Sequence, residues 1–204
     1  ESGSTIGLNS LSSNQTLEYK TTSSDWTSMS TSTNITFDNI GDKVYVRGVL
    51  SGDNDMYSNY TQFKMTGKIA ASGNCNALWN YMKLNAPLKK YCGYYMFRDC
   101  TSLTQALELP STTLAGSCYH NMFYGCTSLT TAPSILPATT LKSYCYEYMF
   151  FGCTSLTQAP ELPATTLASG CYSSMFDSCT SLTTAPELPA TTLARYCYRY
   201  MFSG

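Results

Sequence analysis

Charged residues are scarce in this chain. Only 12% of its 204 residues are charged, and the formal net charge is -1 at pH 7. A protein that binds nucleic acid needs a patch of lysine and arginine to neutralise phosphates, and the sequence contains no basic stripe. No apolar run approaches the roughly 20 residues that a membrane-spanning helix requires. We therefore expect no nucleic-acid partner and no membrane insertion in this segment.

Histidine is scarcer still, because His120 is the only one. A cysteine–histidine nucleophile pair would have to combine it with a cysteine such as Cys118 or Cys126. The positions equivalent to His120 in the repeat described below carry four different residues: Tyr94, Glu147, Ser173 and Arg199. Such a variable position does not indicate a catalytic group, and no glycine-rich phosphate loop occurs. We expect a protein that is not an enzyme and has no cofactor.

What the chain does contain is an internal repeat. Residues 153–178 return almost unchanged as residues 179–204, and looser copies begin at Cys75, Cys100 and Cys126. The first cysteines of successive copies are 25, 26, 27 and 26 residues apart. A period of this length is typical of stacked units that cannot bury their apolar faces alone. The chain ends where the next cysteine would be due, so we expect the native protein to continue beyond Gly204.

The ten cysteines form two ladders, with one rung of each ladder in every copy. Zinc sites typically use close Cys-x-x-Cys pairs, which this chain lacks. If the interval from Cys171 to Cys179 is mostly helical, the two lie about 12 Å apart, too far for a shared metal or a disulfide. We expect buried free thiols that pack as small hydrophobic groups, and no metal site. Disulfides between neighbouring copies remain the alternative, because strand-like neighbours lie about 4.8 Å apart.

Residues 1–73 have a different composition, rich in serine, threonine and asparagine and without cysteine. Residues 34–37, 43–50 and 60–69 contain partly alternating β-branched and aromatic residues, and turn signals separate them. This pattern predicts a small antiparallel β domain over residues 1–73. The domain could cover the open end of the five 25–27-residue repeats, which occupy residues 74–204.

Within each copy, apolar residues recur every four positions, as at Leu167, Cys171 and Met175. This spacing favours one face of a short helix, and Gly152 is suited to a left-handed helix C-cap. Residues 182–188 carry apolar residues at every third position and indicate a short strand before a proline. The predicted fold class is an α/β solenoid, a leucine-rich-repeat-like stack of short strand plus short helix units preceded by the small β domain.

Over residues 75–204 the copies resemble the BspA-like (Treponema pallidum-type) leucine-rich repeats of bacterial surface proteins. That family combines Ala-Phe, Cys-x-x-Leu and Leu/Ile-Pro segments. The counterparts here are Met149-Phe150, Cys153-x-x-Leu156 and Leu162-Pro163. The resemblance implies a surface-exposed protein that functions in adhesion or recognition.

Two pairs of positions vary between copies, one just before the second cysteine and one just before Met-Phe. On a helix whose inner face carries leucine, cysteine and methionine, these positions point away from the core. Their tyrosine, serine, glycine, asparagine and arginine resemble an antibody paratope, although exposed positions can also simply drift. The candidate ligand-binding residues are Tyr94, Tyr95, His120, Asn121, Tyr144, Glu147, Tyr148, Arg195, Tyr196, Arg199 and Tyr200.

These features predict a non-catalytic recognition or adhesion protein, extracellular or at the cell surface. Its partner would be a host or bacterial surface protein or glycan, bound through the tyrosine-rich face. Two alternatives remain. The repeats are a structural spacer, or they belong to a phage tail or fibre that contacts a bacterial surface, which would place the protein in a phage virion.

Overall fold

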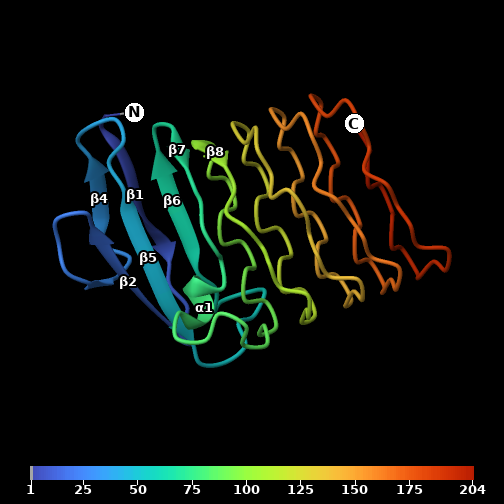
Figure 1. Cartoon of the computed structure of the whole chain (residues 1–204), viewed down its shortest axis with the longest axis horizontal. Coiled ribbons are helices and arrows are strands. Elements are labelled where there is room, and N and C mark those ends of the chain that lie inside the picture. Colours follow the sequence, from blue (N-terminus) through green and yellow to red (C-terminus); the bar gives the residue numbers. More distant parts are fainter. Residues whose placement is uncertain (1) are drawn as a thin grey trace.

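The computed structural model describes residues 2–204. Two three-stranded antiparallel sheets form the N-terminal part, with strand orders β4-β1-β6 and β3-β2-β5. The strands are β1 (Ser4–Ser10), β2 (Gln15–Thr21), β3 (Thr27–Met29), β4 (Asn34–Phe37), β5 (Val44–Leu50) and β6 (Gln62–Thr66). β4, β5 and β6 lie within the three stretches that the sequence predicts as strands. In Figure 1 these sheets occupy one end of the molecule.

Alternation of side chains along the strands builds the core of this β domain. Ile6 and Leu8 of β1, two residues apart, are both buried, as is Leu17 of β2. Successive side chains of a strand point to opposite faces, so alternate residues share one face of the sheet. Ile6 pairs with Ile35 of β4 and Met65 of β6, which places apolar side chains side by side across the sheet. Such cross-strand pairs stabilise antiparallel sheets.

The repeat copies follow the β domain and lie side by side, one after another, toward the C-terminus (Figure 1). We call residues 91–99, 117–125, 144–152, 170–178 and 196–204 the turn segments. In the first of them, the amides of Gly93 and Phe97 donate to the carbonyls of Cys118 and Met122 in the next copy. The Tyr95 amide likewise donates to the His120 carbonyl, and the amides of Tyr94 and Met96 bond three residues back, to the carbonyls of Tyr91 and Gly93. Each turn segment is therefore a chain of tight turns hydrogen-bonded to its neighbour.

The predicted strand-plus-helix solenoid of the leucine-rich-repeat type is wrong. Among residues 2–204 the one helix is α1 (Ala77–Asn80), and the only strands after β6 are β7 (Ile69–Ala70) and β8 (Leu103–Gln105). The expected helix fails because every fourth residue of a turn segment has a positive φ, for example Tyr144 (59°), Tyr148 (53°) and Gly152 (69°). A left-handed residue cannot continue a right-handed helix. The four-residue period comes from repeated turns.

Buried and partly exposed pairs of side chains alternate along the third turn segment. In residues 144–152, Cys145-Tyr146 and Met149-Phe150 are buried, and the pairs between and after them are not. Equivalent interior residues stack on one another through the copies. Phe123, Phe150 and Phe176 have centroids 5.5 and 5.7 Å apart, with nearly parallel rings. A parallel column runs through Tyr119, Tyr146, Tyr172 and Tyr198.

The β domain packs directly against the first repeats. The Phe63 amide of β6 donates to the Met96 carbonyl at 2.8 Å. The Phe63 ring stacks on Phe97 at 5.1 Å, so the phenylalanine column begins in the β domain. β7 pairs with β8 in parallel. Apolar groups of the first copy that would face solvent are thereby covered.

All ten cysteines are buried free thiols, in agreement with the expected packing role. Some donate weak hydrogen bonds between copies, as Cys153 Sγ does to the Phe123 carbonyl at 3.2 Å. Within residues 2–204 no helix is long and apolar enough to cross a membrane.

Candidate recognition surface

Most of the predicted ligand-binding residues lie on the outward-facing pairs of the turn segments. The structure divides these residues into two groups according to their exposure. Tyr94, His120 and Asn121 are buried, whereas Tyr144, Tyr196 and Tyr200 are 40–60% exposed. The split follows the direction of the array, because the buried group lies near the β domain and the exposed group near the C-terminal end.

The buried group differs from the expectation that all these positions point to solvent. Tyr60, just before β6, packs edge-on against both Tyr94 and Tyr95, with centroids 5.6 and 5.4 Å away. His120 lies between Tyr94 and Tyr148, at 5.5 and 6.1 Å. Neighbouring aromatic rings thus cover positions that face away from the interior pairs. We infer that Tyr94, Tyr95, His120 and Asn121 support the surface and offer little contact area.

The exposed group gathers the remaining large side chains of the last three copies. Arg195 and Arg199 lie over the Tyr196 ring at 4.6 and 5.3 Å, and Arg199 also lies over Tyr200 at 4.8 Å. These cation–π contacts orient both guanidinium groups among aromatic rings and leave them at the surface. We define the tyrosine–arginine patch as this exposed group together with Tyr148, which is partly buried; its members are Tyr144, Tyr148, Arg195, Tyr196, Arg199 and Tyr200.

Large and small residues alternate across the patch from copy to copy. Gly170 and Ser174 stand in the fourth copy where the third has Tyr144 and Tyr148 and the fifth has Tyr196 and Tyr200. A Cβ atom placed on Gly170 would come within 2.5 Å of the Tyr144 ring. The small residues therefore make room for the tyrosines of a neighbouring copy.

The tyrosines of the patch occupy an unfavourable backbone conformation. Tyr144, Tyr148, Tyr196 and Tyr200 all have φ between 53° and 59°. For a residue with a Cβ atom this left-handed region costs about 1–2 kcal/mol. Gly170 adopts the same conformation with φ of 62° and shows that the chain can place glycine there.

His120 and Glu147 are the two titratable groups beside the buried part of the surface. His120 Nδ1 lies 3.3 Å from Glu147 Oε2, without the geometry of a hydrogen bond. Burial lowers the pKa of His120 to about 4, and burial raises the pKa of Glu147. Both shifts favour the neutral forms. His120 is therefore uncharged at neutral pH.

We expect His120 to make the folded protein sensitive to mild acid. The pKa of His120 in the folded protein lies below the ordinary 6.5. The contribution of this residue to folding stability is therefore fully present above pH 6.5 and is lost as the pH falls toward 4. Urea unfolding should show that the free energy of unfolding of the wild-type protein is lower at pH 4.5 than at pH 7.5. In His120→Gln this decrease should be smaller by about 1–3 kcal/mol. Glu147 acts in the opposite direction in both proteins, so the difference between them isolates His120. Equal losses in the two proteins would contradict this assignment.

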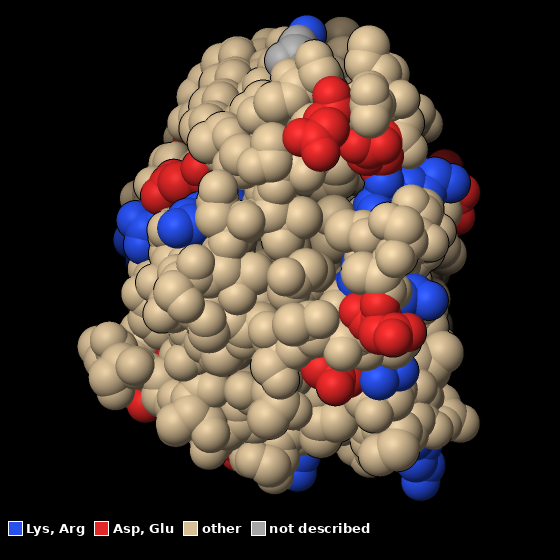
Figure 2. Space-filling model, turned by 90° about the vertical axis from the view of Figure 1, so that its left-hand side faces the viewer, with Lys and Arg blue, Asp and Glu red and all other residues tan. Residues whose placement is uncertain are grey.

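Neither the acidic residues nor the cysteines of the described part of the chain gather into a metal-binding group. No group of three or more histidine, cysteine, aspartate and glutamate residues within 2–204 is placed to hold a metal ion. Burial raises the pKa of the Cys126 and Cys153 thiols well above the usual value, so both are protonated at neutral pH. On the β-domain end of the molecule, basic and acidic side chains lie in small mixed groups (Figure 2).

Sequence reasoning missed two aromatic residues next to the patch. Phe151 packs edge-on against Tyr148 at 5.8 Å and stacks on Tyr124 at 4.7 Å. Both lie just before a glycine of positive φ, Gly152 and Gly125, and are partly exposed. Both residues directly follow the repeated Met-Phe pair, and this position in the repeat could have identified them as candidates.

Comparison of the chain with models of known protein families, with curated proteins and with solved structures finds no match, so it lends no support to the BspA-like resemblance.

Proposed function

We propose that this protein is a non-catalytic recognition protein that binds a protein or glycan on a host or bacterial surface through the tyrosine–arginine patch. One observation carries the proposal: tyrosines that are exposed or partly exposed recur at backbone positions where tyrosine is costly. Tyr144, Tyr148, Tyr196 and Tyr200 have positive φ, and Tyr196 and Tyr200 are about half exposed.

The backbone cost argues against simple drift of exposed residues. Glycine adopts positive φ without penalty, and asparagine adopts it more readily than other residues. Drift at such positions would favour these residues, yet four of the six patch residues are tyrosines with positive φ. Residues held in sparsely populated conformations concentrate at functional sites.

The chemistry of the patch suits a polar partner with flat or ring-shaped groups. Tyrosine contributes a rigid ring and a hydroxyl with little loss of side-chain entropy on binding. Arg195 and Arg199 add donors for carboxylate, amide or hydroxyl oxygens. Tyrosine and arginine are also enriched at protein interfaces and among their energetic hot spots. Such a surface belongs outside the cell or on the cell surface.

The test replaces three patch residues by those that the fourth copy carries at the same positions. Tyr148→Ser, Arg199→Ser and Tyr200→Ser convert them to the equivalents of Ser174 and Ser173. The wild-type chain should be captured on a glycan array or a matrix-protein array, and the triple variant should lose at least tenfold in capture, since hot-spot residues each cost about 2 kcal/mol or more. Its melting temperature should not fall.

Tyr57→Ser is the matched control, because Tyr57 is 88% exposed and lies in the β domain, away from the patch. It should bind as the wild type does. Unchanged capture by the triple variant would reject the patch as the binding surface.

A structural spacer is the second candidate, and the continuous phenylalanine column favours it. The column stacks from Phe63 through Phe176 to Phe202 at spacings of 5.1–5.7 Å. Such an array would set a fixed length in a larger surface protein or in a phage tail or fibre. Absence of capture on both arrays would favour this alternative.

A further inference from the structure

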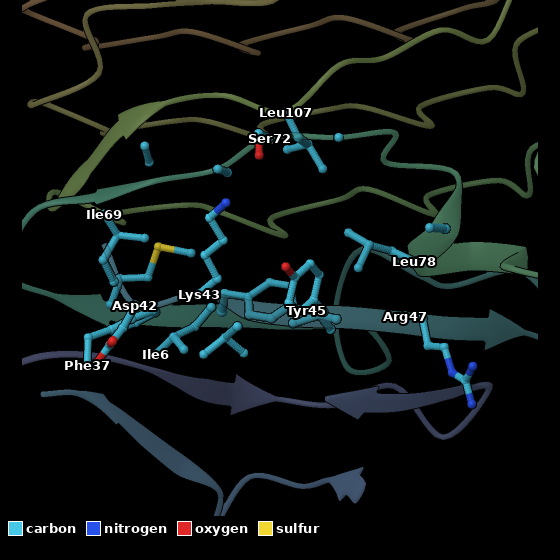
Figure 3. A pocket seen from close by; sticks show the side chains of 18 of the residues that line it. Ile6, Phe37, Asp42, Lys43, Tyr45, Arg47, Ile69, Ser72, Leu78 and Leu107 are labelled. Carbon is cyan, nitrogen blue, oxygen red and sulfur yellow. The ribbon is translucent and has the colours of Figure 1, made fainter. Parts of the chain in front are cut away.

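A cavity of about 930 Å³ lies between the β domain and the first repeat, away from the tyrosine–arginine patch. It is bounded by β5, by β6 and by residues 68–74, and Leu78 of α1 and Leu107 beside Ser72 also line it (Figure 3). No patch residue lines it. Small-molecule sites are typically concave spaces of about 300–1,000 Å³ lined mostly by apolar groups.

The floor and walls of the cavity are apolar. Ile6, Phe63 and Leu107 form buried parts of its lining. Phe37, Val44, Val46, Met65 and Ile69 also line it, but the chain's own side chains leave them only partly buried. A ligand that covers this apolar surface and removes it from water is stabilised by about 25 cal/mol per Å² of surface buried.

The charged groups at the rim differ in whether they already have partners. Arg47 is held by Glu18 at 2.7 Å and stacks over Trp26 at 4.0 Å. Asp42 accepts a hydrogen bond from the Asn39 amide at 2.8 Å, which directs the carboxylate into its own turn.

Two lysines line the cavity, and Lys43 is the one without a partner, since Lys68 interacts within the chain. Among residues 2–204 Lys43 has no hydrogen bond or ion pair, and its side chain extends into the space between β5 and the segment around Ser72 (Figure 3). The cavity thus combines an apolar interior with a free ammonium group at its opening.

We propose that this cavity binds a small amphipathic carboxylate, with an alkyl or aryl body in the apolar space and its carboxylate on Lys43. An apolar molecule without charge would leave the ammonium group unpaired, and a cationic one would oppose it. The carboxylate satisfies Lys43 near the surface, where the pair needs no complete desolvation.

The test is a calorimetric titration of the whole chain with decanoate, decanol and decyltrimethylammonium, below their aggregation concentrations. Decanoate should bind saturably and more tightly than the other two. Lys43→Met should weaken decanoate binding about three- to fivefold and leave decanol binding unchanged, as expected for one partly exposed ion pair. Ala71→Trp should fill the cavity and abolish binding of both.

Lys64→Met is the matched control, because Lys64 is exposed on β6 and does not line the cavity. It should bind decanoate as the wild type does, and so should the triple serine variant of the patch, which makes this test independent of the proposed recognition function. The proposal is overturned if decanoate shows no saturable binding, if the cation binds better, or if Lys43→Met has no effect. Lys43 is exposed, so its variant tests the proposal even if Ala71→Trp fails to fold.

Discussion

Phe150→Ala should lower the free energy of unfolding by about 3–5 kcal/mol, the usual loss when a buried phenylalanine is truncated. Phe150 is fully buried and lies between Phe123 and Phe176, with ring centroids 5.5 and 5.7 Å away. The substitution removes a ring that two neighbouring copies contact, and the parallel stack leaves little freedom for the cavity to collapse. Urea unfolding followed by circular dichroism measures the change.

Phe202→Ala provides the control at the same repeat position. Phe202 stacks on Phe176 at 5.7 Å but is 43% exposed, because no described residue covers its other face. We expect a loss of about 1 kcal/mol or less from this partly exposed ring. Equal losses at both positions would mean that the column does not couple the copies.

The nine thiols other than that of Cys197 should react in the folded protein with a disulfide reagent at least about a hundredfold more slowly than an exposed cysteine. The thiolate is the nucleophile, and burial raises the pKa of Cys171 to about 11 and those of Cys100 and Cys179 to about 12. A rise of two units alone lowers the thiolate fraction about a hundredfold at neutral pH. Thr157→Cys supplies the exposed reference, since Thr157 is at the surface.

After denaturation, all ten cysteines should react rapidly. A smaller number would reveal disulfides between copies and contradict the free-thiol assignment. The raised pKa values also predict how the buried thiols contribute to the free energy of unfolding. Their contribution is fully present below about pH 9 and falls as the pH rises toward 12, because the unfolded chain then loses thiol protons more readily than the folded chain. Unfolding measured at pH 8 and pH 10 tests this sign.

The interior of the repeats was predictable in part. Met149, Phe150 and Cys153 recur in copy after copy, and all three are fully buried. Recurrence at a fixed period requires the same environment in each copy, and the environment that tolerates least change is a packed interior. Gly152 was expected to be a left-handed C-cap of a helix; it does adopt a left-handed conformation, with φ of 69°, but it ends a turn segment and not a helix.

The recognition surface was harder to predict, because exposure depends on neighbours outside the repeat. His120 and Arg199 occupy equivalent positions, yet His120 is buried and Arg199 is exposed. Tyr60 comes from outside the repeats and packs against Tyr94, which in turn packs against His120. The period of the repeat does not predict a contact with a residue that lies outside it. The apolar cavity beside Lys43 has the same origin, since its walls come from segments far apart in the chain.

The sequence alone determined the period of the copies, the recurring cysteine and methionine side chains that the copies bury and the positions of β4, β5 and β6 in the first domain. Only the tertiary structure decided the backbone conformation of the copies. A helix bonds its amides within one copy, whereas the turn segments send alternate amides to the next copy, as from Tyr146 to Cys171. That choice depends on a neighbour about one repeat away, and a four-residue spacing of apolar side chains is compatible with both arrangements.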